Sequence, residues 1–344
     1  MSPGKLNSGR MTRRRNGEGG SAAEIVFRNV TKRYAGRTEA AVSDLSLEVP
    51  AGEICVLIGP SGSGKTTAMK MVNRLISITE GDITIDGRSV KDLDVTELRR
   101  GIGYVIQQIG LFPHMSVEDN IATVPRLRGW EKSRIRERVR ELLELVGLDP
   151  DEDPGRYPSE FSGGQRQRVG VARAMAADPP IMLMDEPFGA IDPITRERLQ
   201  NDFLRLHALI RKTVIFVTHD IDEAIKMGDR IAILRPGGVL AQYDTPDTIL
   251  ASPADEFVAD FVGADRGLKR LSLRRLRDIE LDPVPPGNGV TRIDADTTLR
   301  DALSLMLAGQ VERLLVMDEQ RPLGICTVDV IGRLLATRGT DAPA

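Results

Sequence analysis

The stretch GPSGSGKTT, residues 59–67, holds the residue types with the clearest chemistry. It fits the pattern G-x-x-x-x-G-K-[ST] and lies between an apolar run, ICVLIG, and a segment with helical spacing. Glycines let successive backbone N–H groups turn toward phosphate oxygens, and a helix N-terminus adds positive potential. We expect the lysine to reach the β- and γ-phosphates of a nucleotide and the first threonine hydroxyl to hold Mg²⁺. The predicted phosphate-binding residues are Gly59, Pro60, Ser61, Gly62, Ser63, Gly64, Lys65, Thr66 and Thr67.

A second candidate anion site is FSGGQ, residues 161–165, which precedes the helix-forming run RQRVGVARAMAA. Backbone donors at the start of that helix and a serine hydroxyl would suit phosphate oxygens. This segment cannot serve the same triphosphate from the same side as the phosphate loop. Its predicted nucleotide-binding residues are Ser162, Gly163, Gly164 and Gln165.

The two segments together resemble ATP-binding-cassette (ABC) ATPases, whose signature sequence is usually LSGGQ, with Phe161 here in place of leucine. The resemblance implies that IMLMDE, residues 181–186, is the Walker B strand. Asp185 would then be the carboxylate associated with Mg²⁺, and Glu186 would polarise the attacking water. Adjacent residues at a strand end point in opposite directions, so separate roles for two neighbouring carboxylates are geometrically reasonable.

Three further segments resemble functional loops of the same family. GAID, ending at Asp192, resembles the D-loop, and VTHD resembles the switch, with His219 as the γ-phosphate contact. Tyr34 stands where the family places the aromatic ring that stacks on adenine. Gln107 resembles the Q-loop glutamine that senses Mg²⁺, with Gln108 as the alternative. The implied catalytic residues are Glu186, His219 and Gln107, and the implied Mg²⁺ residues are Thr66, Gln107 and Asp185.

The mechanism that the resemblance implies needs two copies of the chain. Each ATP would lie between the phosphate loop of one copy and the SGGQ segment of the other, so we expect a head-to-tail homodimer. ATP binding would close the dimer and hydrolysis would release it. Phosphoryl transfer depends on positioning and charge stabilisation, which explains why the implied residues are donors, cations and carboxylates.

The elements that must position these residues follow an α/β pattern. Short continuous apolar runs, such as 181–184 and 214–218, predict parallel strands that are covered on both faces, and they alternate with helical segments. In EKSRIRERVRELLELVG, the apolar residues recur at helical spacing, which predicts an amphipathic helix, and Gly147 predicts its C-terminal end. The fold predicted with the resemblance is an ABC ATPase domain with a mixed-sheet core, a β subdomain and a helical signature subdomain, followed by a small α/β module.

Composition excludes several other classes of protein. The chain has 47 Lys+Arg against 50 Asp+Glu, a formal net charge of −3, so nothing indicates nucleic acid as the partner. The two cysteines, Cys55 and Cys326, have no metal-binding or CxxC spacing and suit a reducing compartment. The sequence has no apolar run of the roughly 20 residues that span a bilayer, so transport would need separate transmembrane permease subunits.

The pattern along the chain predicts five regions. Residues 1–23, rich in Gly, Ser and Arg, are expected to be a disordered basic tail, with Met11 as an alternative start to Met1. Residues 24–263 form the ATPase domain, and the last residues, 338–344, form a flexible tail. Between them, residues 264–287 are a predicted basic linker and 288–337 a strand–helix–strand–strand–helix module.

Finer sequence detail, including QQIGLFPHMSVEDNI and THDIDEAIKMGDRIAIL, is similar to the ATPase subunits of osmoprotectant importers, which take up glycine betaine, carnitine, choline or proline. The resemblance implies a peripheral subunit on the cytoplasmic face of the membrane, joined to permeases and acting indirectly with a substrate-binding protein. Alternatives are an importer ATPase for a polyamine, amino acid or sugar, and a soluble ABC protein.

The module at 288–337 resembles a single cystathionine-β-synthase (CBS) motif, an element that normally occurs in pairs. Its copies could pair across the ATPase dimer, or the element could be vestigial packing. In GICTVDV the acid comes one residue early, with Val330 at the ribose-binding position, so we do not expect adenosine binding. The linker cations Lys269, Arg270, Arg274, Arg275 and Arg277 could contact a membrane surface or lie on a solvated helix.

Overall fold

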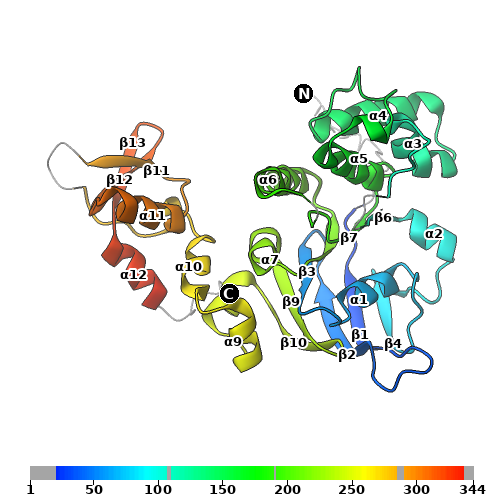
Figure 1. Cartoon of the computed structure of the whole chain (residues 1–344), viewed down its shortest axis with the longest axis horizontal. Helices are drawn as coiled ribbons and strands as arrows, with labels where there is room; N and C mark the ends of the chain where they lie inside the picture. The colour runs from blue at the N-terminus through cyan, green and yellow to red at the C-terminus, as the bar shows by residue number, and fades with distance from the viewer. Residues whose placement is uncertain (1–20, 107–109, 190, 285–289, 337–344) are drawn as a thin grey trace, which may run out of the picture.

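A computed structural model describes residues 21–106, 110–189, 191–284 and 290–336. These residues form three sheets: a four-stranded sheet, a six-stranded central sheet and a three-stranded sheet near the C-terminus. Figure 1 shows the third sheet at one end of the long axis, reached through α9 and α10. Within the described residues, no helix is both long and apolar enough to cross a membrane.

The four-stranded sheet is the predicted β subdomain. Its strand order is β2-β1-β4-β5, and every neighbouring pair is antiparallel. Alternating apolar residues such as Ile25 and Phe27 are buried, as expected for a sheet with one face on the core. The strands are β1 (Ile25–Lys32), β2 (Val42–Val49), β4 (Glu80–Ile85) and β5 (Arg88–Ser89).

The central sheet has the order β10-β9-β3-β8-β7-β6, parallel except for the antiparallel β9–β10 pair. Every residue of β3, β7 and β8 is buried, which confirms the strands predicted from continuous apolar runs. Because β3 pairs with β8 and β8 with β7, the segments that follow these three strands meet at one edge of the sheet. The strands are β3 (Ile54–Ile58), β6 (Ile102–Val105), β7 (Ile181–Asp185), β8 (Thr213–Val217), β9 (Arg230–Arg235) and β10 (Val239–Asp244).

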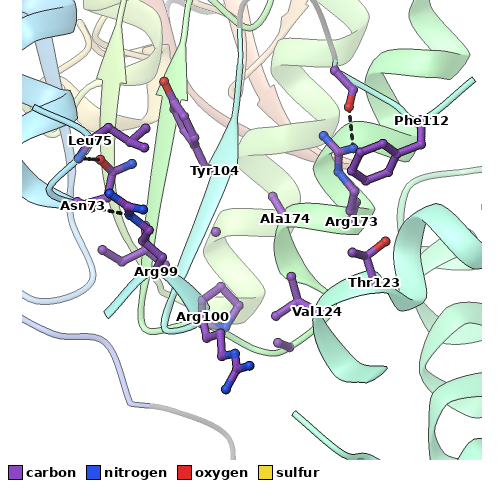
Figure 2. A pocket seen from close by; sticks show the side chains of 15 residues that line it. Asn73, Leu75, Arg99, Arg100, Tyr104, Phe112, Thr123, Val124, Arg173 and Ala174 are labelled. Atoms are coloured by element: carbon purple, nitrogen blue, oxygen red, sulfur yellow. Dashed lines mark hydrogen bonds between the residues drawn. The ribbon is translucent and has the colours of Figure 1, made fainter. Parts of the chain in front are cut away.

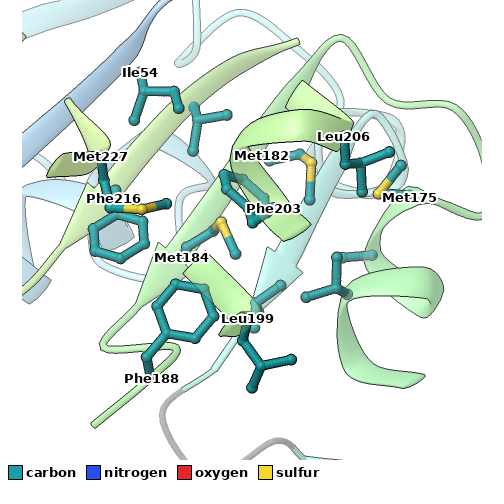
Figure 3. Packing of buried hydrophobic residues seen from close by; sticks show 14 of the residues in the cluster. Ile54, Met175, Met182, Met184, Phe188, Leu199, Phe203, Leu206, Phe216 and Met227 are labelled. Atoms are coloured by element: carbon teal, nitrogen blue, oxygen red, sulfur yellow. The ribbon is translucent and has the colours of Figure 1, made fainter. Parts of the chain in front are cut away.

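Helices cover both faces of the central sheet and bury separate clusters of apolar side chains. Figure 3 shows Leu199, Phe203 and Leu206 near Met182 and Met184, with the Phe188 and Phe216 rings alongside at a centroid distance of 5.9 Å. The helices around the sheet are α1 (Lys65–Val72), α2 (Val95–Arg100), α6 (Pro193–Ile210) and α7 (Ile221–Met227).

A separate helical subdomain lies between β6 and β7 in the sequence (Figure 1). In α4, Ile135, Val139, Leu142 and Leu143 are all buried, and Gly147 follows with a φ of +68°, so this predicted amphipathic helix and its stop are confirmed. The elements are α3 (Val117–Leu127), α4 (Lys132–Leu145), the 3-10 helix η1 (Pro158–Glu160) and α5 (Gly163–Met175).

The C-terminal sheet and its helices have their own cluster of buried side chains, in the predicted strand–helix–strand–strand–helix order. Cys55 and Cys326 are both free thiols and both buried, and burial raises the pKa of Cys55 to about 12 and of Cys326 to about 11, so neither is primed for thiolate chemistry. The elements are β11 (Thr291–Asp294), α11 (Leu299–Gly309), β12 (Arg313–Asp318), β13 (Arg321–Thr327) and α12 (Val328–Ala336).

The described part of the segment predicted as a linker, residues 264–284, is more structured than expected. Leu271 and Leu276 are buried in the C-terminal cluster, while Arg270 pairs with Asp247 of α8 at 2.7 Å. The segment is therefore held to the C-terminal module by buried leucines and to α8 by an ion pair. The elements here are α8 (Pro246–Ala251), α9 (Glu256–Val262), α10 (Arg266–Leu271) and η2 (Leu276–Asp278).

Each of the five linker cations pairs with a carboxylate of the chain, and the side chains of Arg274, Arg275 and Arg277 are 41%, 56% and 41% exposed. Each lies within 4.0 Å of a carboxylate oxygen, and in such a pair the two charges offset each other. The pairs are Lys269 with Asp265, Arg270 and Arg274 with Asp247, and Arg275 and Arg277 with Asp296.

Candidate functional site

The phosphate loop joins β3 to α1 through glycines that no other residue could easily replace. Gly59, Gly62 and Gly64 have φ values of +151°, +81° and +80°. A Cβ on Gly64 would lie 2.2 Å from the carbonyl oxygen of Ala41, well inside contact distance. The backbone therefore adopts a turn that depends on glycine and opens toward the start of α1.

The Lys65 ammonium lies over this loop. Its Nζ donates to the carbonyl oxygens of Gly59 at 2.8 Å and Pro60 at 3.0 Å, and lies 3.4 Å from the Ser63 hydroxyl. Burial lowers the pKa of Lys65, with Glu186 acting in the opposite direction. A cation held by neutral carbonyls would gain a stronger partner in a phosphate, because charge-assisted hydrogen bonds are the stronger kind.

Thr66 and Asp185 come together from α1 and the end of β7. The Thr66 hydroxyl donates to Asp185 Oδ1 at 2.9 Å, and Lys70 Nζ lies 3.9 Å from the other oxygen. Burial raises the pKa of Asp185, although the Thr66 hydrogen bond lowers it. Mg²⁺ prefers oxygen ligands such as hydroxyl and carboxylate groups, so Thr66 and Asp185 fit that ion.

Glu186 and His219 face each other across the ends of β7 and β8. Glu186 has a φ of +43°, a conformation uncommon for a residue with a Cβ, and its N–H donates to the Val217 carbonyl at 2.9 Å. This turn directs its carboxylate to within 3.3 Å of His219 Nδ1. The His219 side chain is 64% exposed and the Glu186 side chain 23%, so both can reach a bound molecule.

One pocket of about 600 Å³ joins most of these residues. Tyr34 lies on its wall, and the Lys32 ammonium sits 5.1 Å from the centroid of the tyrosine ring. Arg37 and Ala41 also line this pocket, although the sequence analysis did not single them out. The sequence feature that could have indicated them is their position shortly after Tyr34. The lining residues are Tyr34, Arg37, Ala41, Ser61, Gly62, Gly64, Lys65, Thr66, Thr67, Glu186 and His219.

The signature segment stands at the start of α5. The Ser162 hydroxyl accepts from the Gln165 N–H at 3.2 Å, while the Gln165 side chain accepts from the Ser162 N–H at 2.9 Å, which forms a capping box. Gly163 is exposed beside Ser162, and Gly164 follows it in the first turn. Among the described residues that line the nucleotide-sized pocket, none comes from this segment.

Asp192 also lies outside that pocket as far as the described residues show. Its carboxylate caps α6 by accepting from the Thr195 N–H at 3.0 Å, and this bond lowers the pKa of Asp192. The predicted Q-loop residue Gln107 and its alternative Gln108 lie outside the described residues.

Gly110, the first described residue after the predicted Q-loop, borders a groove of about 330 Å³ between the central sheet and the helical subdomain. Figure 2 shows Tyr104 on one side, Thr123 and Val124 on the other, and Arg173 reaching toward Phe112. Arg173 donates to the Gly110 carbonyl at 2.6 Å, so α5 holds the segment that follows the predicted Q-loop.

This geometry defines a P-loop ATPase whose phosphate loop and signature segment lie on different parts of the chain. The family described as ABC transporter matches residues 42–189. The chain is 50% identical to the osmoprotectant import ATP-binding protein OsmV of Salmonella typhimurium over 304 residues, 87% of this chain and 78% of that protein. It is also 50% identical to the glycine betaine/carnitine/choline transport ATP-binding protein OpuCA of Bacillus subtilis over 308 residues, 89% of this chain and 79% of that one.

Among solved structures, the chain resembles the ATP-binding cassette MJ0796, described as a dimer in a post-hydrolysis state bound to ADP and Pi. The TM-score is 0.57 at 34% identity, covering 64% of this chain and 98% of that one. The chain therefore belongs to the ABC transporter family, as an ATP-binding subunit that hydrolyses ATP.

Proposed function

We propose that this chain powers the import of a quaternary-amine osmoprotectant, such as glycine betaine, choline or carnitine, or of proline. The observation that carries the solute class is the similarity to two import subunits. The chain is 50% identical, over most of both chains, to one subunit whose name states an osmoprotectant and to another whose name states glycine betaine, carnitine and choline. The ATPase subunit does not itself bind the solute, so the similarity indicates the transport system to which it belongs.

Nucleotide binding is assigned to the pocket that contains the phosphate loop. Tyr34 would stack on the adenine, and the loop amides with Lys65 would hold the phosphates. Thr66 and Asp185 would hold Mg²⁺, whose chemical contribution is to offset charge on the phosphate oxygens. Gln107 remains a predicted third participant.

Hydrolysis is assigned to Glu186 and His219. The Glu186 carboxylate would orient a water molecule and accept its proton, and the 3.3 Å contact with His219 Nδ1 fixes the direction of that carboxylate. The exposed His219 ring would contact the terminal phosphate, and Lys65 would stabilise the charge that develops there.

The active form is proposed to be a head-to-tail homodimer. Ser162 through Gln165 lie outside the pocket that contains the phosphate loop, so a second chain is needed to bring a signature segment onto a bound nucleotide. Asp192, at the start of α6, would lie at that interface. The dimeric state of the similar MJ0796 cassette supports this arrangement.

Separate membrane permeases are proposed to contact the groove shown in Figure 2. The groove combines apolar residues with Arg99 and Arg100 and borders the segment after the Q-loop. Binding there would place the chain at the cytoplasmic face of the membrane, with a substrate-binding protein acting on the other side through the permeases.

The domain division is also a proposal. Residues 24–263 form the ATPase unit and 288–337 the C-terminal module, with 264–287 shared between them. Support comes from the separate clusters of buried side chains in the two units.

The test is uptake of labelled glycine betaine at low and high osmolarity, in cells that lack this chain and are complemented with wild type, Glu186→Gln or Glu197→Gln. Glu197 is an exposed carboxylate on α6 and serves as the control. We expect wild type and Glu197→Gln to restore uptake and Glu186→Gln to fail. Purified Glu186→Gln should bind ATP and dimerise while its kcat falls about 10²- to 10⁴-fold. Normal hydrolysis by Glu186→Gln would refute the catalytic assignment, and absence of osmoprotectant uptake with wild type would refute the solute class.

A further inference from the structure

The turn between α3 and α4 gathers positive charge, although the whole chain has a net charge of −3. Residues 126–134, the α3–α4 tip, contain four Lys or Arg and one Glu, and all five are exposed: Arg126, Arg128, Glu131, Lys132 and Arg134. Arg126 pairs with Asp119 at 2.6 Å. Within the described part of the chain, the other three cations of the tip form no ion pair with a carboxylate. The tip therefore presents local positive charge to its surroundings.

Two apolar side chains lie among these cations. Leu127 is 59% exposed, and Trp130 is half-buried and packs against the large apolar cluster. The Arg134 guanidinium lies over the Trp130 ring, 3.8 Å from its centroid. The Trp130 N–H donates to the Pro125 carbonyl at 3.1 Å, which ties the backbone of the turn to α3. Cations beside leucine and tryptophan are the combination of side chains that binds a membrane interface.

The tip is continuous with the groove that is proposed to bind the permeases (Figure 2). Thr123 and Val124, which line that groove, lie near the end of α3, just before the tip. Arg128 donates to the carbonyl of Ala177 at 3.4 Å, and Ala177 also lines the groove. A permease bound in the groove would therefore place the tip on the membrane side of the subunit.

Anionic lipid headgroups match the charge of this surface better than a permease does. The cytoplasmic loops of membrane proteins carry an excess of Lys and Arg, which would repel the cations of the tip. The cytoplasmic leaflet carries anionic headgroups instead, and their phosphate oxygens accept charge-assisted hydrogen bonds from Lys and Arg. Charge complementarity therefore favours the lipid surface as the partner.

We propose that the α3–α4 tip binds anionic phospholipid headgroups through Arg128, Lys132 and Arg134, while Leu127 and Trp130 enter the interfacial layer. The orientation of the tip toward the membrane rests on the proposed docking of permeases in the groove. Each Lys or Arg near an anionic surface strengthens binding about fivefold, so removal of three should weaken it about 100-fold. Added salt should weaken binding too, because it screens exposed charges.

The test uses the purified full chain and vesicles of phosphatidylcholine, either alone or mixed with phosphatidylglycerol. Trp130 is the only tryptophan of the sequence, so its fluorescence reports on the tip alone. With vesicles that contain phosphatidylglycerol, at low salt, we expect the emission to shift to the blue and brominated acyl chains to quench it. We expect neither effect with phosphatidylcholine alone or at high salt.

Two triple variants separate the tip from the remaining surface charge. Replacing Arg128, Lys132 and Arg134 by glutamine should weaken co-sedimentation with the anionic vesicles about 100-fold. The matched control should bind as wild type, because it removes three exposed charges that lie on β1, β5 and α6, namely Arg28→Gln, Arg88→Gln and Arg198→Gln.

Three results would overturn the inference: a wild-type chain that does not bind the anionic vesicles, binding without quenching of Trp130, or a tip variant that binds as wild type. Loss of osmoprotectant uptake in the tip variant, without vesicle binding by wild type, would assign the tip to a permease contact instead. The vesicles contain neither permease nor solute, so this outcome is separate from the proposed function. Absence of uptake with wild type still concerns the solute class.

Discussion

Gly64→Ala should destabilise the protein much more than Gly62→Ala, although the two glycines have nearly the same φ, +80° and +81°. A left-handed conformation costs a residue with a Cβ about 1–2 kcal/mol, and both variants bear that cost. The added Cβ at Gly62 has no heavy atom within 4 Å outside its chain neighbours, so this strain is the whole expected effect in the absence of nucleotide.

At Gly64 the new Cβ would meet backbone that is already held in place. It would lie 2.2 Å from the Ala41 carbonyl oxygen and 3.0 Å from Val42 Cγ2. The Ala41 N–H donates to the Lys32 carbonyl at 2.8 Å, so this backbone cannot easily retreat. Forcing a methyl group into packed structure adds about 1–3 kcal/mol, which gives a total of about 2–5 kcal/mol for Gly64→Ala.

Thermal unfolding without nucleotide measures the difference, since 1 kcal/mol shifts the melting temperature by about 2–4 °C in a domain of roughly this size. We expect Gly62→Ala to lower it by a few degrees and Gly64→Ala by at least twice as much. Gly64→Ala should also weaken ATP binding at least tenfold, because its relief requires the phosphate loop to move. Equal melting temperatures for the two variants would refute the argument that backbone contact, rather than φ, makes Gly64 irreplaceable.

Three further predictions concern stability. Asp185→Asn should abolish hydrolysis yet gain stability relative to wild type as the pH rises above about 4. Burial raises the pKa of Asp185, so the folded protein binds the proton more tightly than the unfolded chain, and wild-type stability falls as the pH rises through the pKa of the folded state. Urea unfolding of both proteins at several pH values measures this, and a stability difference that does not change with pH would contradict it. Leu142→Ala should cost about 2–5 kcal/mol in urea unfolding, because that side chain is fully buried in the helical subdomain, and a loss under 1 kcal/mol would be inconsistent with its packing. Arg270→Ala should cost about 1–3 kcal/mol by leaving Asp247 without its nearest cation, whereas Arg205→Ala, at an exposed site, should cost under about 0.5 kcal/mol; equal losses would show that the Arg270 pair contributes no more than a surface pair.

Much of the fold could be predicted because its signals are local. Continuous apolar runs specified β7 and β8, and helical spacing with a terminal glycine specified α4. The phosphate loop was also visible, since positive φ at Gly62 and Gly64 is a requirement that glycine meets without help from distant residues. The segment 264–287 was less predictable: its cations suggested a solvated linker, but their carboxylate partners come from α8 and from the C-terminal module.

Residues that can bind phosphate, carry a proton or end a strand are recognisable along the chain, because those capacities belong to side chains and short backbone patterns. Which of these residues meet depends on the folded arrangement. The order β3-β8-β7 brings His219 to Glu186 and Thr66 to Asp185, and the packing of α6 on α7 pairs Gln200 with Glu223. Such contacts join residues that are distant along the chain, and no local pattern encodes the partner of a buried polar group, because its partner is set by strand order and helix packing.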